Sequence, residues 1–501
     1  MHGENRLNST RQWSMLPCLV NFSTFLCLKS SGQTRNFETM RLYTVIILVF
    51  LSLSTVKAQY TVTLDSTVLT VDTVISGLDV PWEILIGPDK DIWFTERHGK
   101  ISKVDIATGQ RKVLLDHRGS VYQFNESGML GMMLHPNFST NPWVYVAYTY
   151  VKNSTVKERI SRFAYANDSL TGEEILIDDI PGNTTHDGCR FLLLPDNTVI
   201  LTTGDARKDA DAQKVDALNG KVLRMTLDGK IPSDNPNPNS YVWSWGHRNA
   251  QGLTLGPMNK IYSSEHGPTS DDELNILSKG RNFGWPNVEG ICNSAIEKTF
   301  CQDSNVVEPI FYWTPTIAPS DLIYYSHPAI PEFNNTLVMT VLKTKEIVTF
   351  KLDASGETVS SSKSYFKQKF GRLRDICVDS EGVIYLATNG ASWSNSDPNT
   401  HVILRLRNMK FIGVEEEQKS SGHLFKIFPN PSNGSLNIQT TLASINSVIK
   451  ILDSQGRTVD EIKVEGRQTS YNSAHLQSGY YILEMNEPHS SQSTKWLHTG
   501  N

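Results

Sequence analysis

The sequence predicts an all-β chain, a six-bladed β-propeller followed by a small C-terminal β-sandwich. One phrase, a turn followed by a β-branched or aromatic strand and a polar stop, recurs four times between residues 60 and 412, a region without helical periodicity. Several short alternating strands, separated by turn residues, fill residues 424–501. Repeated strand units build propellers, and a short series of closely spaced strands builds a sandwich.

The repeated phrase sets the size of the unit. Its four copies are centred on Ile92, Val199, Ile261 and Ile384. The intervals between these residues are 107, 62 and 123, close to two, one and two units of about 60 residues. A unit of that length holds the four strands of a blade, so residues 59–412 hold about six blades. The alternatives are an array of β-sandwiches or chance recurrence of hairpin signals; the shared unit length favours the propeller.

Composition bounds the class of protein. The 501 residues carry 47 Lys and Arg against 52 Asp and Glu, for a net charge of −5. This balance argues against a nucleic-acid binder, which normally shows a basic domain or stripe. One long apolar run excludes a polytopic membrane protein, and six cysteines are too few for a disulfide scaffold. Cys292 and Cys301 enclose a short loop and could pair in an oxidising compartment, which composition leaves open.

The apolar run lies near the N-terminus and is typical of a secretory signal peptide. It covers Leu42–Leu53, follows a positively charged start and precedes a small-residue exit at Ala58. About a dozen apolar residues are too few for a comfortable membrane span. We therefore expect a signal peptide over 40–58, translation from Met40, and a spurious extension over 1–39.

A polar linker over residues 413–423 precedes the last region. On physical grounds alone the β-sandwich over 424–501 could be a carbohydrate-binding or adhesive module. Its motifs FPNPSNG, ILDSQGR and LQSGYYILEM, in that order, resemble the C-terminal sorting domain of bacterial type IX secretion cargo. The resemblance implies export through the periplasm and outer membrane by the type IX secretion machinery, a secreted or cell-surface location, and no membrane span in the mature chain.

Polar motifs in the loops of a propeller are candidate site residues, because the loops between blades converge on one mouth of the central channel. The candidates are His186, Arg248, Asn249, Arg372 and Arg374. The last two lie two apart in a strand-like run, so both point to one face. Each candidate also has a non-functional explanation. Loop histidines are usually surface residues, and two arginines are usually exposed charges unless an anionic ligand occupies the channel.

An acidic run, Asp271-Asp272-Glu273, follows the turn at Gly267-Pro268. Such a run is usually a solvated face. With backbone carbonyls nearby it is also a set of hard oxygen ligands suited to Ca²⁺, although it is not an EF-hand.

In this order the motifs match a family. The stretch from about Gly77 to Arg407 resembles the quinoprotein glucose/sorbosone dehydrogenases, six-bladed propellers that use pyrroloquinoline quinone (PQQ) and calcium. The matching runs include NGKVLR (219–224), GHRNAQG (246–252), EHGP (265–268), NFGWPNV (282–288), PTIAP (315–319) and RLRD (372–375). The resemblance implies an oxidoreductase that converts an aldose sugar at C1 to its lactone by hydride transfer to PQQ, with an external electron acceptor.

The resemblance also implies roles for single residues. His186 is the general base for the anomeric hydroxyl, and Arg248 stabilises charge at the quinone oxygens. The residues that hold PQQ are Asn249, Thr316, Lys343, Arg372 and Arg374. The calcium ligands are the carbonyls of Gly267 and Pro268, with Asp272 and Glu273 at a second, structural site. The residues on the substrate side are Glu126 and Asp205.

The chain departs from the family pattern near the substrate. Glu126 stands where the glucose enzyme has a glutamine, and Thr185 where it has an aspartate. Thr314 falls in register with an aromatic residue near the cofactor, and Cys189 takes a position that is usually glycine. These changes leave the sugar open. They also keep open a non-catalytic, calcium-stabilised propeller that binds a glycan or a protein; a calcium-dependent lactonase is disfavoured by the motif order.

Overall fold

The computed structural model describes residues 59–390, 399–411, 424–440, 447–453, 456–466, 468–487 and 490–499. The predicted extension, signal peptide and linker lie outside these ranges. The all-β prediction is confirmed: within the described residues the one α-helix is α2 (Ala295–Ser304), beside two 3₁₀ turns, η1 (Asp209–Gln213) and η2 (Pro257–Asn259). No helix in these ranges is long and apolar enough to cross a lipid bilayer.

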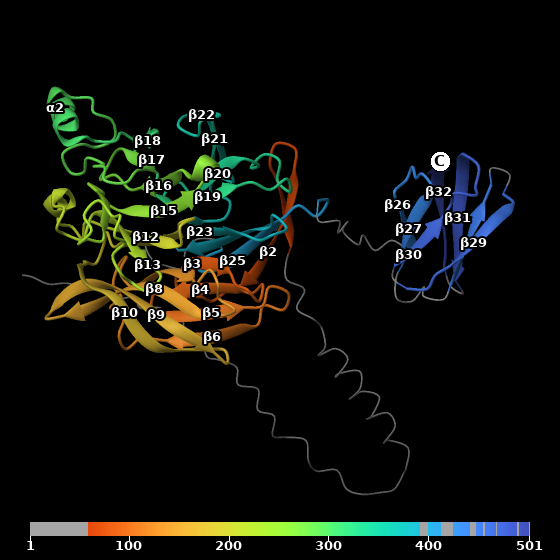
Figure 1. Cartoon of the computed structure of the whole chain (residues 1–501), viewed down its shortest axis with the longest axis horizontal. Helices are drawn as coiled ribbons and strands as arrows, with labels where there is room; N and C mark the ends of the chain where they lie inside the picture. Colours follow the sequence, from red (N-terminus) through yellow and green to blue (C-terminus); the bar gives the residue numbers. More distant parts are fainter. Residues whose placement is uncertain are drawn as a thin grey trace, which may run out of the picture. The chain divides into compact units, whose positions relative to one another are not determined.

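Strands β1 to β25 form six antiparallel sheets in the described part of residues 59–411 (Figure 1). Five of them have four strands in chain order: β3–β6, β7–β10, β11–β14, β15–β18 and β19–β22. The sixth has the order β1-β2-β25-β24-β23. The bounds are β1 (Tyr60–Thr63), β2 (Val68–Ile75), β3 (Pro81–Ile86), β4 (Ile92–Glu96), β5 (Lys100–Val104), β6 (Arg111–Asp116), β7 (Met129–Leu134), β8 (Trp143–Lys152), β9 (Thr155–Ala166), β10 (Ser169–Pro181), β11 (Gly188–Leu193), β12 (Thr198–Thr203), β13 (Lys221–Thr226), β14 (Val242–Trp245), β15 (Ala250–Leu255), β16 (Ile261–Glu265), β17 (Asp272–Leu277), β18 (Phe311–Trp313), β19 (Pro319–Tyr325), β20 (Thr336–Val341), β21 (Ile347–Leu352), β22 (Val359–Tyr365), β23 (Arg372–Val378), β24 (Ile384–Asn389) and β25 (Ile403–Arg407).

The six sheets form a closed ring. One strand of each sheet packs against its counterpart in the next, in the order β3, β7, β11, β15, β19 and β23, and β23 packs against β3. We call these six the inner strands. The phrase that recurs in the sequence forms the strand next to the inner strand in four sheets, namely β4, β12, β16 and β24. Every residue of β4 (IWFTE) and β24 (IYLATN) is buried, so each strand begins with a run of apolar residues and ends on polar residues that are also buried.

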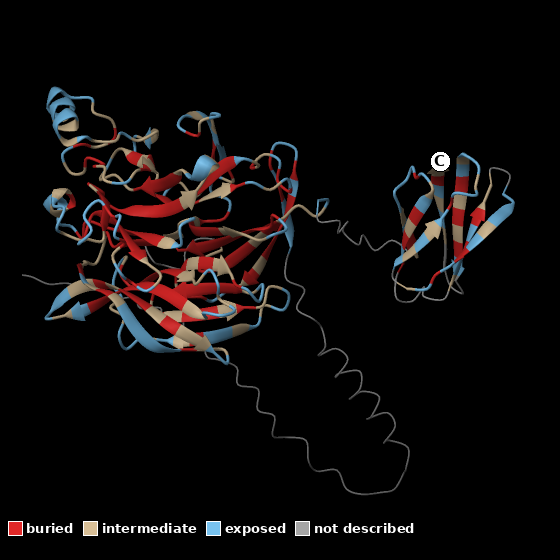
Figure 2. Ribbon diagram, in the orientation of Figure 1, coloured by how far each residue is buried: buried red, intermediate tan, exposed pale blue. Residues whose placement is uncertain are grey.

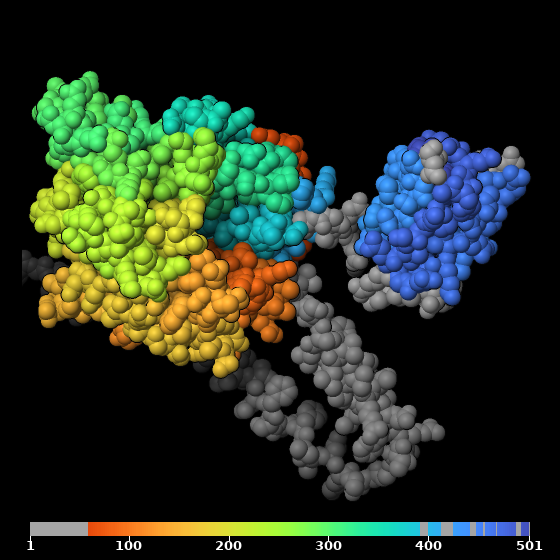
Figure 3. Space-filling view, viewed as in Figure 1, coloured from red at the N-terminus to blue at the C-terminus, as the bar shows by residue number. Residues whose placement is uncertain are grey.

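The two ends of this region pair with each other. β2 runs antiparallel to β25, with Thr70 opposite Arg407, so the first strands complete the last sheet. In the space-filling view of Figure 3, orange residues from the start of this region lie against teal residues from its last part. Asp72 on β2 is 2% exposed and accepts hydrogen bonds from Arg405 Nη2 (2.6 Å) and Arg407 Nη2 (2.9 Å) on β25. A buried carboxylate between two guanidinium groups thus joins the ends of the ring.

Apolar side chains fill the spaces between neighbouring sheets, where the strands of Figure 2 are red. One such cluster, between the sheets β3–β6 and β7–β10, contains Trp93, Met129, Tyr148 and Phe163. Helix α2 lies outside the core, and none of its residues is buried. The disulfide between Cys292 and Cys301 ties this helix to the segment before it, so the pairing that composition left open is formed.

The C-terminal region has its own sheets and core. Its strands are β26 (Phe425–Phe428), β27 (Ser435–Thr440), β28 (Val448–Leu452), β29 (Thr458–Lys463), β30 (Gln468–Asn472), β31 (Gly479–Glu487) and β32 (Ser490–His498). In the described part of 424–499 they form two sheets, β26-β27-β30 and β29-β28-β31-β32. Alternate residues of each sheet contribute to one apolar cluster that includes Leu436, Ile451, Leu483 and Trp496.

Candidate active site

A cavity of about 220 Å³ lies at the first residues of the inner strands. Each inner strand contributes one or two residues at or beside its start, and the loops add Glu126, Asp187 and His266. The strand contributions are Trp82, Leu130, Gly188, Asn249, Gln251, Ala318, Arg372 and Arg374, joined by Leu342. The strand starts therefore converge on one polar space at the centre of the ring.

His186 lies beside this cavity in the turn before β11, with a left-handed φ of +64°. Its Nδ1 lies 2.8 Å from Asp205 Oδ1, and its Nε2 lies 3.2 Å from Arg248 Nη2. A guanidinium can only donate, so Nε2 carries a lone pair and Nδ1 carries the proton that Asp205 accepts. His186 is thus held as a neutral imidazole with its basic nitrogen at Arg248.

The turn that carries His186 depends on a close backbone approach. A Cβ atom at Gly204 would lie 1.8 Å from the His186 carbonyl oxygen, so only glycine fits there. The His186 backbone N–H donates to Glu126 Oε2 (2.9 Å), which brings the loop before β7 to the same turn. The predicted substrate residue Glu126 therefore lines the cavity and also supports the histidine.

Asp205, the other residue predicted on the substrate side, faces His186 and Trp285 instead of the cavity. Its side chain is fully buried. Oδ1 also accepts the Arg207 backbone N–H (2.8 Å), and Oδ2 accepts Trp285 Nε1–H (2.9 Å). Burial raises the pKa of Asp205, but the hydrogen bonds from His186, the Arg207 backbone and Trp285 outweigh burial and leave the pKa below its ordinary value. Asp205 is an ionised partner of the histidine.

Arg248 and Asn249 are held through Glu265 at the end of β16. Glu265 Oε1 accepts the backbone N–H of Arg248 and that of Asn249 (3.2 Å). The Asn249 side chain enters the cavity wall, where its Oδ1 accepts Gly188 N–H (3.2 Å) and Gln251 Nε2–H (3.0 Å). Arg248 Nη1 donates to the His266 carbonyl (3.1 Å), while its buried Nε has no hydrogen-bond partner among the described residues.

Two arginines add positive charge to the cavity wall. Arg372 and Arg374 both line the cavity from the start of β23, as their spacing predicts. Burial, and then the charge of Arg372, lower the pKa of Arg374 to about 9. Arg374 Nη1 donates to Gln251 Oε1 (3.0 Å), and its buried Nε has no partner within the described ranges. Buried guanidinium nitrogens left open at Arg248 and Arg374 fit an anionic ligand with carboxylate oxygens.

Lys343 and Thr316 do not line the cavity. They lie next to it, because Leu342 is a lining residue and Lys343 N–H donates to the Ile317 carbonyl. Lys343 Nζ donates to Thr316 Oγ1 (2.8 Å). The structure thus brings these two predicted residues together as one hydrogen-bonded pair.

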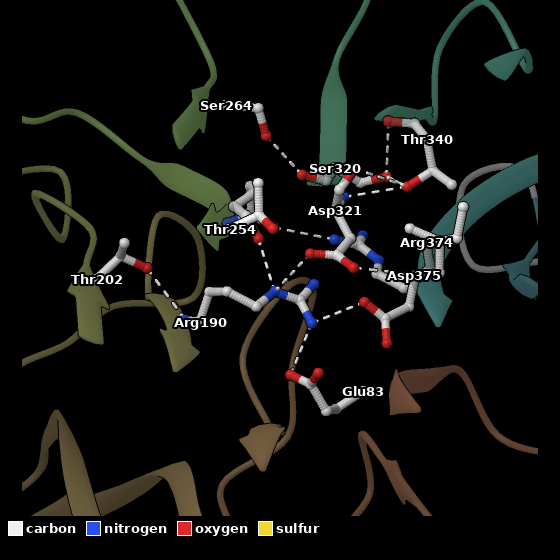
Figure 4. Close-up of polar contacts among 12 residues, drawn as sticks. Glu83, Arg190, Thr202, Thr254, Ser264, Ser320, Asp321, Thr340, Arg374 and Asp375 are labelled. Carbon is white, nitrogen blue, oxygen red and sulfur yellow. Dashed lines mark hydrogen bonds and ion pairs between the residues drawn. The ribbon is translucent and has the colours of Figure 1, made fainter. Parts of the chain in front are cut away.

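Farther along the inner strands, Arg190 forms ion pairs with carboxylates from three other sheets (Figure 4). Arg190 Nη1 lies 2.6 Å from Glu83 Oε2 and 2.7 Å from Asp375 Oδ1, and Nε lies 3.3 Å from Asp321 Oδ1. Burial is the largest cause of the raised pKa of each carboxyl, and for Glu83 the value reaches about 7. One guanidinium among three buried carboxyl groups implies that the cluster retains protons at neutral pH.

A second buried acidic pair stands behind the wall beside His186. Asp187 lines the cavity and is 2% exposed, and Glu158 on β9 is fully buried. Burial raises the pKa of Asp187 to about 7, and burial followed by the charge of Asp187 raises the pKa of Glu158. Cys189 Sγ lies 3.5 Å from Glu158 Oε2. Because the charge of Asp187 raises the pKa of Glu158, the pair favours a proton on one of its two carboxyl groups.

The predicted metal ligands separate into two environments. Neighbouring residues of a strand point to opposite faces, and Asp272 and Glu273 do so at the start of β17. Asp272 accepts the backbone N–H groups of Gly267 (2.8 Å), Ile317 (2.6 Å) and Ala318 (2.8 Å), so its carboxylate is already bonded at both oxygens to the backbone. Asp272 and Glu273 therefore do not meet at one site.

Glu273 lies instead at a small hollow of about 10 Å³ lined also by Glu265, Gly267 and Pro268. Burial, and then the charge of Glu265, raise the pKa of Glu273 to about 8. Among the described residues, no three His, Cys, Asp or Glu side chains converge as a metal site would require. Any cation here would depend on the backbone carbonyls.

Sequence reasoning singled out His186, Arg248 and the two arginines of β23, but it missed Trp82, Gln251 and Asp187. These three become part of the site only because their strands start at the same end of the ring. The Arg190 cluster was missed for the same reason, since its members lie on four different sheets. Within that cluster a sequence signal existed for Arg190, which stands four residues after the candidate His186.

Comparison with known proteins agrees with this geometry. Residues 78–394 match the family model of glucose/sorbosone dehydrogenases, and residues 426–498 match that of the secretion system C-terminal sorting domain. Quinoprotein glucose dehydrogenase B of Acinetobacter calcoaceticus is 30% identical over 407 residues, which cover 64% of this chain and 85% of that protein. The PQQ-bound aldose sugar dehydrogenase of Streptomyces coelicolor is 28% identical with a TM-score of 0.59, covering 68% of this chain and 98% of its own. The apo form of the soluble aldose sugar dehydrogenase of Escherichia coli is 25% identical with a TM-score of 0.60, covering 68% and 99%.

Proposed function

The chain belongs to the glucose/sorbosone dehydrogenase family, whose members are oxidoreductases, and from this premise we propose that it oxidises an aldose sugar at C1 to the lactone with PQQ as hydride acceptor. The observation that carries the proposal is the neutral His186, paired with ionised Asp205, beside a cavity walled by Arg372 and Arg374. It joins a general base to a binding place for an anionic, planar cofactor.

His186 is proposed as the base. Its Nδ1 proton is committed to Asp205, so Nε2 is the nitrogen that accepts the proton of the C1 hydroxyl. Arg248 contacts the same Nε2 and must move from it when the sugar hydroxyl arrives. Its guanidinium then remains near the reacting atoms, where it stabilises negative charge. Glu126, at the cavity wall beside this turn, is placed to accept a hydrogen bond from a sugar hydroxyl.

PQQ would be held by the positive wall. Arg372 and Arg374 would bind its carboxylates, and Asn249 and the Lys343–Thr316 pair would bind its remaining polar atoms. The open guanidinium nitrogens of Arg248 and Arg374 support this assignment. When bound, PQQ supplies a two-electron acceptor for the hydride from C1, and an external acceptor regenerates it.

We propose that calcium binds at the carbonyls of Gly267 and Pro268, with Glu273 nearby as an oxygen ligand. The small hollow supports a cation there, because four acidic residues line it (Glu265, Asp271, Glu273 and Glu289) against one guanidinium, that of Arg248. Asp272 is left out of this site, since three backbone N–H groups occupy its oxygens.

The architecture and export of the protein follow the same proposal. The closed ring of six sheets supports a six-bladed β-propeller over 59–412, and the two sheets around one core support a β-sandwich over 424–501. The sorting-domain match supports transport by the type IX secretion machinery to the cell surface or the medium, after removal of a signal peptide at 40–58.

The test is a titration of the purified full chain with PQQ in the presence of Ca²⁺, followed by quinone absorbance. We expect saturable binding that weakens roughly 10- to 100-fold in Arg374→Ala, the loss of a charged hydrogen bond, and is unchanged in the surface variant Arg118→Ala. The loaded protein should then reduce an artificial acceptor with an aldose, and His186→Ala should remove turnover but keep PQQ binding. Bound PQQ without turnover over a broad sugar panel would overturn the reaction. Absence of binding at high micromolar PQQ would favour a non-catalytic propeller that binds a glycan or protein.

A further inference from the structure

We propose that Trp285 is a positioning residue for His186, holding the two side chains that contact the two ring nitrogens of the histidine. The indole N–H fixes Asp205, the partner of Nδ1, and the indole face supports Arg248, the partner of Nε2. This inference rests on the proposed function, because it assumes that His186 is the base. It concerns only residues of this chain and can be tested without PQQ.

Trp285 is itself rigidly placed, which a positioning residue requires. Its backbone N–H donates to the Gly246 carbonyl (3.0 Å), and its carbonyl accepts Gln213 Nε2–H (2.6 Å). Gln213 in turn donates to Asn282 Oδ1 (3.0 Å), in the segment that leads to Trp285. The tryptophan is thus anchored by the segment before Arg248 and by the turn η1, independently of its side chain.

The first contact of Trp285 is the hydrogen bond from its indole N–H to Asp205. Nε1–H donates to Oδ2 at 2.9 Å, while Oδ1 receives His186 Nδ1 at 2.8 Å. A carboxylate held at both oxygens cannot rotate about its Cβ–Cγ bond without losing a hydrogen bond. Asp205 is buried, so water does not replace a lost donor. Trp285 therefore keeps Asp205 ionised and aimed at Nδ1, which fixes the histidine tautomer.

The second contact of Trp285 is made by the face of its ring, with the guanidinium of Arg248. The guanidinium carbon of Arg248 lies 5.3 Å from the ring centroid, within the range of a cation–π contact. From this position Arg248 Nη2 reaches His186 Nε2 at 3.2 Å. One indole thus contacts both groups that flank the imidazole, from a part of the chain that contributes nothing else to the cavity wall.

The contributions of these two contacts can be separated by removing only the indole N–H group. Trp285→Phe keeps an aromatic face beneath Arg248 and removes the donor to Asp205. Incorporation of β-(3-benzothienyl)alanine at 285 replaces N–H by sulfur in a bicyclic ring of nearly the same shape, and it covers the case in which Trp285→Phe fails to fold. The matched control is Trp143→Phe on β8, because Trp143 also lies beneath an arginine (Arg162, 4.5 Å) but lies outside the cavity.

The first measurement is ¹⁵N NMR of the histidine ring nitrogens in the cofactor-free full chain, with the His186 signals assigned from His186→Asn. We expect a proton on Nδ1 in the wild type and in Trp143→Phe. Both changes at 285 let the Asp205 carboxylate rotate while Arg248 stays at Nε2, so the hydrogen bond from Nδ1–H to Asp205 should weaken, seen as an upfield shift and faster exchange of the Nδ1 proton. An Nδ1 proton signal that neither change at 285 alters in folded protein would overturn the inference.

The second measurement is turnover of the PQQ-loaded protein. We expect kcat to fall roughly 10- to 100-fold in both 285 variants, the usual effect of removing a supporting partner, with KM for the aldose and PQQ affinity within about 2-fold. An unchanged kcat beside a weakened hydrogen bond from Nδ1–H would overturn the catalytic part of the inference. If the wild type binds PQQ but oxidises no sugar, the proposed function fails, while the NMR measurement still decides what Trp285 does.

Discussion

Replacing Asp72 should open the ring at the sheet where its two ends meet. Asp72 is 2% exposed and pairs with Arg405 and Arg407, whose side chains are 17% and 16% exposed. Breaking a buried ion pair from one side costs about 3–5 kcal/mol, because the remaining charges lose their partner. A region of about 350 residues unfolds with an entropy near 0.7 kcal/mol/K, so Asp72→Asn should lower Tm by about 4–7 °C.

The assay is a thermal unfolding scan of the full chain at fixed protein concentration and scan rate. Asp65→Asn is the matched control, since Asp65 pairs with Lys363 at the surface, where both side chains are about half exposed. That change should cost less than about 1 kcal/mol and shift Tm by about 1 °C at most. Equal shifts for Asp65→Asn and Asp72→Asn would refute the argument that burial of the ion pair holds the ring closed.

Three further predictions concern the interior and the site. Glu83 has a raised pKa of about 7, so the stability that its protonated form contributes is present at low pH and is lost as pH rises from about 4.5 to 7. The Tm of Glu83→Gln should therefore fall less between pH 5 and pH 8 than that of the wild type. An unchanged pH dependence of Tm would contradict this. Asp205→Asn should lower kcat by about three to four orders of magnitude with little change in PQQ affinity, because the amide favours the wrong histidine tautomer; a loss below 10-fold would count against it. Replacing Cys292 and Cys301 by serine should destabilise the α2 segment by about 2–3 kcal/mol, measured as faster amide exchange in 292–304, and should leave PQQ binding intact.

The sequence could predict the strands that are buried on both faces. The strands β4, β12, β16 and β24 were found because both of their faces are covered, so each has β-branched or aromatic residues soon after a turn and ends on a polar residue. The outer strand β22 gives no such signal, since five of its seven residues, VSSSKSY, are exposed. Strand order, the ring and its closure depend on contacts between residues hundreds of positions apart.

The candidate site was predictable where a single residue type carries the chemistry. His186 and the arginines of β23 stand out as chemical groups, and the structure places them around one cavity. The hydrogen-bond partners of a side chain could not be predicted in this way. Asp205 was expected at the substrate, yet its partners His186 and Trp285 are 19 and 80 residues away in the sequence. Likewise Asp272 and Glu273 are adjacent in sequence, but strand alternation sends their carboxylates to different surroundings.

The pairing of β2 with β25 also governs the order in which the region can fold. The contact between Asp72 and Arg407 spans 335 residues, one of the largest separations that the chain offers. Closing a loop of that length costs about 5 kcal/mol of chain entropy before any contact rewards it. The five other sheets are local meanders whose strands meet within a few dozen residues, so they can form first. Ring closure is then the slow, last step, and until it occurs β2 and β25 present unpaired edges to which a second chain can add.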